Sequence, residues 1–408
     1  MGMTTQRLAA AMWLVTLAGA ASAAPVSVGV ATFNMDWAGT AADFQTHVGV
    51  CQSVGWCEAQ PRLEKGAAEP SPAAMATASA CASSIEAKAG GPLQAAQMAP
   101  CSAYGTGNPV QYETLGNYGE KLAGLQATVA GLIERDGAQV LAFQGVKSEA
   151  VVRAALGQYG AAFDTCAALN TQFETVALAW DRSLSPTPGV CAVRTEMAIR
   201  DVPTDDAAMP ATTPGLSLML VINKVPVTFM TLELHAGCAN LKASGPGPDA
   251  GHTLDDPAPD CRILNRQVAD LEDWIDGIAS KSPRLVMLGD FNRRIDEEAA
   301  AAVPPAQVRA DGSDPAGPNK RAKYGYVTTR YLWQEIADGK PALYQLPLST
   351  LDAGCTAYAG LDHIVISGAV HALQNQATMV SRKVGVARAA SQVISTSSHC
   401  ARVARLML

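Results

Sequence analysis

The sequence predicts an α/β (α+β) fold in which sheets lie inside and helices lie outside. Strand-like segments outnumber helix-like segments, and they come as hairpins with amphipathic helices placed between them. A hydrophobic content of 48% in 408 residues is ample for a large core. No internal repeat occurs at the periods typical of solenoids. We therefore expect one layered unit.

The strands are predicted by short apolar or alternating runs. Residues 26–34 alternate in the way of a half-buried strand, and residues 140–143 and 285–288 are apolar runs typical of buried strands. Two runs flanking Asn223-Lys224 predict a hairpin. The remaining expected strands cover residues 174–180, 216–222, 225–235, 356–358 and 361–367.

The helices are predicted by apolar residues at helical spacing. Residues 118–134 keep this spacing until Asp136-Gly137 ends the helix, and residues 262–278 form a second amphipathic helix. A shorter helix is expected from Ser148, a plausible N-cap, to Leu156.

The first 23 residues have the features of a secretory signal peptide. Arg7 is followed by a short apolar segment, and Ala21-Ser22-Ala23 is a small-x-small cleavage site. The alternative is an uncleaved anchor helix, but the apolar run is short for a membrane span. We therefore expect an exported protein, periplasmic or secreted, without stable membrane insertion, whose domain covers residues 24–408.

The ten cysteines support export, because an oxidising compartment allows an even number of them to pair. Proximity in sequence suggests Cys166–Cys191, Cys238–Cys261 and Cys355–Cys400 as disulfides. The four others lie within residues 48–110, a segment rich in Ala, Pro and Gly that we interpret as a disulfide-tied insertion. We expect Cys51, Cys57, Cys81 and Cys101 to pair among themselves.

The most informative motif is Gly289-Asp290-Phe291-Asn292, which follows a buried strand directly. A carboxylate and an amide two residues apart can orient a water and donate to a phosphate oxygen. A plain turn would use the same residue types. Other strand ends favour a site, because they also carry polar groups that a buried strand does not need: Asn34, His235, Asp362 and His399.

In this order the motifs resemble those of the endonuclease/exonuclease/phosphatase superfamily, the deoxyribonuclease-I-like hydrolases. The matching pieces, over nearly the whole chain outside residues 48–110, are Thr32-Phe33-Asn34, residues 140–144, Leu234-His235, Gly289-Asp290-Phe291-Asn292, Leu361-Asp362-His363-Ile364-Val365 and Ser398-His399. The resemblance implies a four-layer sandwich of two mixed β-sheets flanked by helices. It also implies metal-assisted hydrolysis of a phosphoester.

The resemblance assigns a role to each matching position. Asn34 would help to hold Mg²⁺, Asp290 would orient the attacking water, and Asn292 would bind phosphate. His235 would hydrogen-bond the phosphate, Asp362 would orient the pair of Asp290 and a histidine, and His399 would act in acid–base chemistry or phosphate stabilisation. A hard divalent ion polarising a phosphoryl oxygen is consistent with these residue types.

Two positions depart from the family pattern. The family has a metal-binding Glu where this chain has Gly145, and an Asp where it has Ser398. Mg²⁺ usually needs at least one carboxylate ligand, so the metal site is expected to be degenerate. Asp36 and Glu233 are the candidate substitutes, because each lies two residues from a predicted site residue and shares its face if the strand persists.

Two functions follow. The first is an exported metal-dependent phosphoester hydrolase with a weakened or rearranged metal site. The alternative is a catalytically inactive member that binds a phosphorylated ligand or serves as a scaffold. A net charge of −7 does not favour nucleic acid as the substrate, although a local basic groove would allow it. Neither the substrate nor an oligomeric state can be inferred from the sequence.

Overall fold

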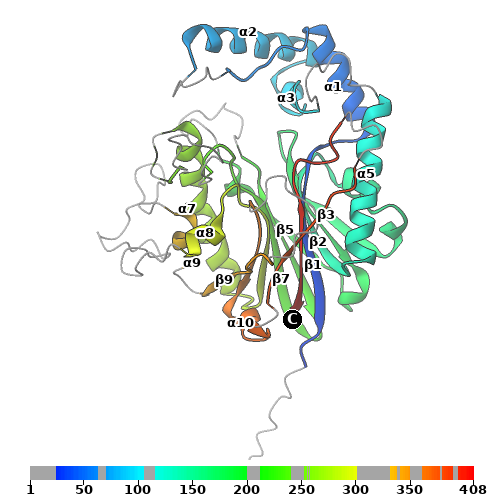
Figure 1. Ribbon diagram of the computed structural model, residues 1–408, viewed down its shortest axis with the longest axis vertical. Coiled ribbons are helices and arrows are strands. Elements are labelled where there is room, and N and C mark those ends of the chain that lie inside the picture. The colour runs from blue at the N-terminus through cyan, green and yellow to red at the C-terminus, as the bar shows by residue number, and fades with distance from the viewer. Residues whose placement is uncertain are drawn as a thin grey trace, which may run out of the picture.

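The computed structural model describes residues 24–62, 70–104, 115–199, 212–239, 252–254, 256, 258–300, 331–337, 341–349, 361–376, 379–388 and 394–408. Its centre is a pair of six-stranded sheets, both of them mixed (Figure 1). The predicted signal peptide and the predicted strand at residues 356–358 lie outside the described residues.

The first sheet has the order β11-β12-β1-β2-β4-β3. Strand β1 runs parallel to β2 and antiparallel to β12, which joins the two ends of the chain in one sheet. Their bounds are β1 (Ser27–Ala38), β2 (Ala138–Val146), β3 (Phe163–Ala167), β4 (Thr175–Asp181), β11 (Arg382–Val384) and β12 (Ala401–Met407).

The second sheet has the order β5-β6-β7-β8-β10-β9. Strands β7 and β8 are parallel, and β10 is antiparallel to β8 with Asp362 opposite Asp290. Their bounds are β5 (Val190–Arg194), β6 (Gly215–Ile222), β7 (Val225–Glu233), β8 (Leu285–Asp290), β9 (Leu343–Gln345) and β10 (Asp362–Ser367).

Helices cover the outer faces and complete the predicted four-layer sandwich (Figure 1). Helices α5 (Leu115–Glu134) and α6 (Glu149–Leu156) pack on the first sheet. Helix α7 (Pro259–Ala279) covers the second sheet with α8 (Ile295–Ala300) and α9 (Leu332–Ala337). The short α10 (Gly368–His371) follows β10.

The largest apolar core lies between the two sheets, and strand alternation decides its members. Val28 and Val30 of β1, Val176 and Leu178 of β4, and Val286 and Leu288 of β8 all point into this layer. The intervening residues of the same strands face the helices. Every residue of these strands can thus be assigned to one of two layers.

The insertion is a helical unit at one end of the sandwich. Helices α1 (Ala41–Ser53), α2 (Pro72–Ala89) and α3 (Pro92–Ala96) lie beyond the upper end of β1 (Figure 1). Disulfides Cys51–Cys101 and Cys57–Cys81 tie them together. A cluster containing Phe44, Tyr104 and Tyr118 packs against α5, and the Tyr104 hydroxyl donates to the Trp37 carbonyl at 2.8 Å. The insertion is therefore anchored where β1 ends.

The structure confirms the sequence-based predictions for the long helices and strands. The hairpin, the helices and the disulfides Cys166–Cys191 and Cys238–Cys261 are confirmed. Cys400 is disulfide-bonded, and its expected partner Cys355 lies outside the described residues. The short edge strands β3, β5 and β11, helix α1 and the final strand β12 were not predicted, because none has a clear apolar period. Among the described helices, none is both long and apolar enough to span a membrane.

Candidate active site

The candidate site lies where the inner faces of six strands end. On each strand, the residues that point into the inter-sheet core begin as apolar side chains and end in a polar or acidic one, and β1 and β7 carry a threonine just before it. The polar terminal residues, in strand order, are Asn34 (β1), Gln144 (β2), Glu174 (directly before β4), Glu233 (β7), Asp290 (β8) and Asp362 (β10). The site is thus the polar end of the inter-sheet layer.

A buried polar bridge closes the floor of this site. Gln144 accepts a hydrogen bond from the Thr32 hydroxyl at 3.0 Å and donates to the Thr231 hydroxyl at 2.9 Å. All three side chains are fully buried. Because a buried amide is costly unless it is paired, this bridge fixes the spacing of the two sheets beneath the site.

His399, Asp362 and Asp290 form the most compact cluster in the site. Nδ1 of His399 lies 3.2 Å from Oδ2 of Asp362 and 3.6 Å from Oδ2 of Asp290. Burial lowers the pKa of His399, but the two carboxylates outweigh it and raise the pKa to about 10. Burial and Asp362 raise the pKa of Asp290 to about 6. At neutral pH the ring is therefore a cation held between two carboxylates.

Asn292 is held in a sharp turn directly after Asp290. It has a positive φ of 50°, and its N–H donates to Oδ1 of Asp290 at 2.8 Å. Its side-chain amide donates to the Leu234 carbonyl at 2.8 Å. The next residue, Arg293, is fully buried and binds Glu298 and the Cys238 carbonyl. The turn therefore holds Asn292 beside Asp290 and His235.

Asn34 joins the two halves of the site. Its Nδ2 donates to Glu233 at 3.0 Å and to Asp290 at 3.1 Å, while its Oδ1 accepts from the backbone N–H of Asp36 at 2.9 Å. In this arrangement Asn34 is a donor that spaces two carboxylates, whereas the sequence predicted a metal ligand. Its Oδ1 keeps a second lone pair beyond the bond from Asp36, and a ligand role would use it.

At Gly145 and Ser398, the two positions where the resemblance implies an acid, a backbone N–H binds a carboxylate from elsewhere. The N–H of Gly145 donates to Oε2 of Glu233 at 3.1 Å. The N–H of Ser398 donates to Oδ2 of Asp36 at 3.0 Å. Asp36 and Glu233, the substitutes suggested by the sequence, thus both lie next to the positions that lack an acid. Asp36 has a positive φ of 54°, a strained conformation typical of functional sites.

Glu174 is a site residue that the sequence reasoning missed. It lies on the same face as Val176 and Leu178, so its carboxylate points between the sheets. Burial, Glu233 and Asp36 raise the pKa of Glu174 well above its ordinary value. Its alternation with Val176 and Leu178 was visible in the sequence, but only the pairing of β4 with β2 places it at the site.

His235 lies at the edge of the site. Its ring pairs with Asp260 at 3.0 Å, and its backbone N–H donates to Gln267 at 2.9 Å. The ring makes no hydrogen bond to Asp290, Asp362 or His399 among the described contacts. Of the five predicted catalytic residues, the structure thus brings Asp290, Asn292, Asp362 and His399 together, and His235 is their neighbour.

The oxygen-rich part of the site has the composition that a hard divalent cation prefers. Oδ1 of Asp362 is buried and has no hydrogen-bond partner within the described part of the chain. Asp36, Glu174 and Glu233 add three carboxylates. Nδ1 of His399 already lies 3.2 Å from Asp362 and 3.6 Å from Asp290. The acidic residues thus fit a hard divalent cation on the side of Asp36 and Glu233.

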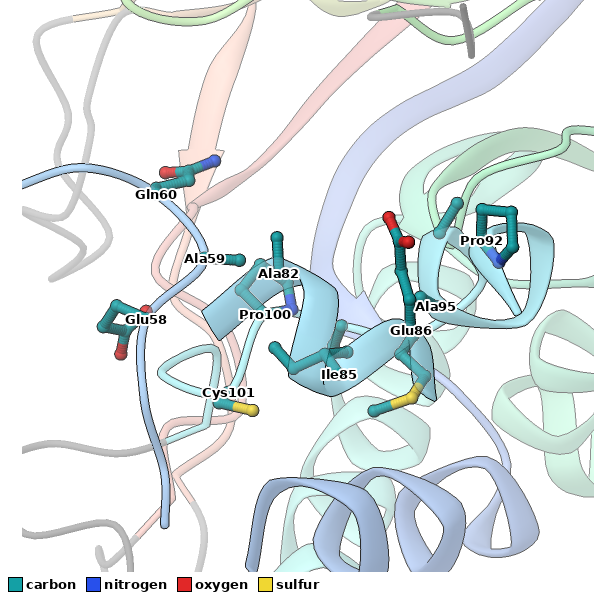
Figure 2. Close-up of a pocket in the computed structure, with 13 residues that line it drawn as sticks. Glu58, Ala59, Gln60, Ala82, Ile85, Glu86, Pro92, Ala95, Pro100 and Cys101 are labelled. Atoms are coloured by element: carbon teal, nitrogen blue, oxygen red, sulfur yellow. The ribbon is translucent and has the colours of Figure 1, made fainter. Parts of the chain in front are cut away.

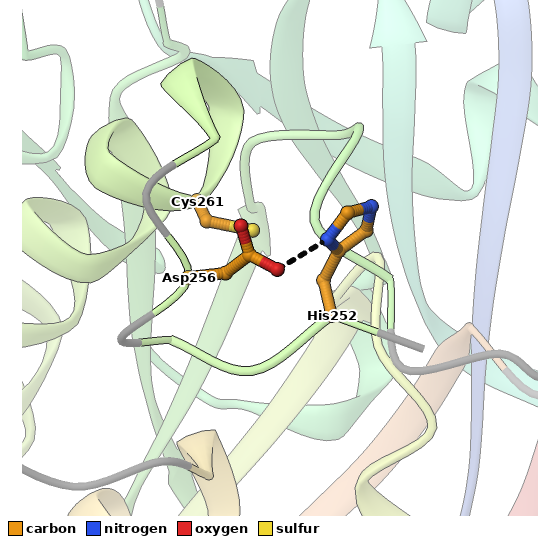
Figure 3. A group of neighbouring side chains, drawn as sticks. All are labelled: His252, Asp256 and Cys261. Carbon is orange, nitrogen blue, oxygen red and sulfur yellow. Dashed lines mark hydrogen bonds and ion pairs between the residues drawn. The ribbon is translucent and has the colours of Figure 1, made fainter. Parts of the chain in front are cut away.

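Two other features lie apart from this site. A cavity of about 310 Å³ lies in the insertion between α2, α3 and residues 58–60, and its walls are mostly Ala, Pro and Ile side chains (Figure 2). His252 and Asp256 pair at 2.8 Å near Cys261, as Figure 3 shows. Cys261 is in a disulfide with Cys238, so this group has no thiolate for a metal.

The strand order, the layers and the convergence of the motifs decide the fold. They agree with the α/β sandwich of two mixed sheets that the resemblance to the endonuclease/exonuclease/phosphatase superfamily implies. No protein-family profile matches the sequence. No curated protein matches it either.

Solved structures of this superfamily resemble the chain at low sequence identity. A superfamily protein from Bacteroides thetaiotaomicron shares 9% identity over 94% of this chain and 98% of its own, with a TM-score of 0.45. The Neisseria meningitidis 3'-5' exonuclease shares 17% over 71% and 97%, with a TM-score of 0.39. The human Nocturnin catalytic domain with bound sulfate shares 11% over 70% and 86%, at 0.38. These similarities are too low to transfer an activity.

Proposed function

We propose that this protein is an exported, divalent-metal-dependent phosphoester hydrolase. The observation that supports this proposal most is the buried cluster of Asp290, Asp362 and His399 beside Asn292. A structural core has no use for a cationic ring between two carboxylates at the edge of an apolar layer, because each charge costs desolvation energy. Perturbed pKa values of this kind gather at functional sites.

Each residue of the cluster would have its own role in phosphoester hydrolysis. Asp290 would accept a hydrogen bond from the attacking water and align it. The protonated His399, oriented by Asp362, would donate to a phosphoryl oxygen and stabilise the charge that develops there. Asn292 keeps one amide hydrogen beyond its bond to Leu234 and would donate it to the same phosphoryl group. A bound Mg²⁺ would polarise the phosphoryl oxygen.

The proposal is tested by hydrolysis of bis-p-nitrophenyl phosphate, p-nitrophenyl phosphate and DNA, each with Mg²⁺, Mn²⁺ or EDTA. We expect a metal-dependent rate that His399→Ala and Asp290→Asn abolish. A surface variant, Asp181→Asn, serves as the control, since Asp181 caps a short turn away from the site. Equal rates in the wild type and in His399→Ala would refute the proposal.

The alternative is an inactive member that binds a phosphorylated ligand without cleaving it. The departures at Gly145 and Ser398 favour this reading, since they remove two acids from the family's metal site. It predicts saturable binding of inorganic phosphate without turnover of any of the three substrates. Export is supported by four disulfides among the described residues, and sequencing the N-terminus of the secreted protein tests it.

A further inference from the structure

The backbone at Gly145 leaves no room for the missing family carboxylate. Gly145 has a positive φ of 62° and lies in a bulge, where residues 144 and 145 both oppose Val176. A Cβ atom at this position would lie 2.4 Å from Oδ1 of Asn34 and 2.8 Å from the nitrogen of Asp36. The backbone conformation and the neighbours of residue 145 thus exclude a glutamate side chain there, and a replacement carboxylate must come from another strand.

Glu233 fills part of this space from the opposite sheet. Its Oε2 accepts from the N–H of Gly145 at 3.1 Å, and its Oε1 accepts from Asn34 at 3.0 Å. Both oxygens therefore face the place where the family's acidic side chain would stand. A carboxylate oxygen has more than one lone pair, so these bonds leave acceptor capacity for a cation.

Glu174 comes from the strand next to the bulge. Val176 opposes residues 144 and 145, and Thr175 is paired with Val146, so Glu174 lies one position past the bulge, on the same face as Val176. Its carboxylate has no hydrogen bond or ion pair among the described residues. Its electrostatic neighbours are Glu233, Asp36 and Asp290, all carboxylates, and the cation His399.

Full ionisation of this acidic cluster would need more positive charge than the described residues supply. The imidazolium of His399 lies between Asp290 and Asp362. The other acidic side chains of the cluster are Asp36, Glu174 and Glu233. Lys121, the nearest buried ammonium, donates to three backbone carbonyls and to none of these acids. A dication between Glu174 and Glu233 would offset the charge and accept their oxygens as ligands.

We propose that Glu174 and Glu233 together hold the divalent cation, so that its carboxylate ligands come from β4 and β7 in place of β2. This proposal rests on the proposed function for the identity of the cation. It assigns Glu174 a ligand role that neither the sequence pattern nor the family resemblance provides. Asp36, fixed by the N–H of Ser398, adds a further carboxylate to this side of the site.

The test is direct measurement of metal binding. EDTA-treated, dialysed protein is titrated with Mn²⁺ in a calorimeter, and its thermal unfolding is recorded with and without Mn²⁺. We expect Glu174→Gln and Glu233→Gln each to weaken Mn²⁺ binding by at least about 10-fold, the lower end of what even outer-shell partners of a metal contribute. The matched control is Glu196→Gln, an exposed glutamate paired with Arg194, which should bind like the wild type.

Two further results separate a ligand from a structural residue. Without metal, Glu174→Gln should unfold at a higher temperature than the wild type, because it removes an acid whose burial beside other acids is costly. Saturating Mn²⁺ should raise the unfolding temperature of this variant by less than it raises that of the wild type. Glu174→Asp keeps the charge and should recover part of the affinity. Equal loss in Glu174→Asp and Glu174→Gln, or wild-type affinity in Glu174→Gln, would overturn the proposal.

The same titration distinguishes this inference from the proposed function. Metal-dependent hydrolysis with unchanged Mn²⁺ affinity in Glu174→Gln would leave the function standing and refute the ligand assignment. Mn²⁺ binding that depends on Glu174, without hydrolysis, would do the reverse. A wild type that binds neither Mn²⁺ nor Mg²⁺ would refute both, and would identify Glu174 and Glu233 as protonated acids.

Discussion

Nδ1 of His399 lies 3.2 Å from Oδ2 of Asp362, so a carboxylate at the start of β10 orients a ring in the segment before β12. The two residues are 37 positions apart in the chain. Asp362 in turn lies opposite Asp290 in the register of β10 and β8. The pairing of β10 with β8 therefore places both carboxylates beside the His399 ring, and the pKa of His399 depends on Asp362.

Replacement of Asp362 by Asn should lower the pKa of His399 well below its value of about 10. Asp362 is the largest influence that raises this pKa, whereas burial lowers it. Hydrolysis should fall by about 100-fold or more, as expected for a lost acid–base partner. The pKa is measured by NMR titration of histidine-labelled protein. Asp164→Asn, at an exposed ion pair with Arg182, should change neither quantity. An unchanged His399 pKa in Asp362→Asn would contradict this account.

Replacement of Glu233 by Gln should flatten the pH dependence of stability in the metal-free protein. Burial and Asp290 raise the pKa of Glu233 from 4.5 to about 8. Between these values the folded protein holds a proton that the unfolded chain releases, so stability falls as the pH rises from 4.5 to 8. Gln is neutral throughout and removes this contribution.

The measurement is the urea midpoint of EDTA-treated protein at pH 5, 6.5 and 8. Glu174, His399 and Asp290 also have raised pKa values, so a smaller decline with the same sign should persist in Glu233→Gln. Glu196→Gln should decline as steeply as the wild type, because its side chain is half exposed. A decline in Glu233→Gln as steep as that of the wild type would show that the pKa of Glu233 is not raised.

Replacement of Gly145 by Ala should destabilise the protein and impair the site. The left-handed conformation alone costs an L-residue about 1–2 kcal/mol, and the new Cβ would press on Oδ1 of Asn34. Gly49→Ala serves as a control, in which the same substitution should raise the stability. Gly49 is exposed within α1, nothing lies within 4 Å of its Cβ position, and Ala should stabilise the helix by about 1 kcal/mol.

Urea unfolding measures both variants, and a Gly145→Ala protein as stable as the wild type would contradict the strained geometry. The same geometry explains why Gly145→Glu is a poor way to restore the family's ligand. The longer side chain would begin with the same clash, so loss of activity in that variant would not report on the metal site.

The sequence predicted most of the fold and the centre of the site because both depend on local patterns. The alternation of Val28 and Val30, and the motif at residues 289–292, are visible in the chain. Glu174 was not found because its importance comes from a neighbour in the sheet, the bulge at Gly145, and not from the residues beside it. The donor role of Asn34 depends on side-chain rotation, which no sequence pattern determines. β12 was missed because Arg402 and Arg405 interrupt its apolar run.

Lys121 is another residue whose role cannot be inferred from the sequence. It belongs to α5, which the sequence predicts as an amphipathic helix, yet its side chain is only 2% exposed. Its ammonium donates to the carbonyls of Met35 at 3.2 Å, Ser395 at 3.4 Å and Thr396 at 2.8 Å. It thus ties the end of β1 to the segment that leads into His399.

Lys121→Met keeps the packing of the side-chain stem and removes the three donors. The unpaired buried carbonyls should cost about 1–3 kcal/mol of stability. His399 should lose its fixed position, and kcat should fall by up to about 100-fold, the effect of a small misplacement of a reacting group. The fall should be larger for kcat than for the affinity for phosphate, because the phosphate-binding groups at the end of β8 are not attached to Lys121.

Lys147→Met removes a lysine that pairs with Asp43 outside the site, and should change stability by about 1 kcal/mol or less with kcat retained. If Lys121→Met and Lys147→Met lose the same stability and neither affects kcat, Lys121 does not position His399.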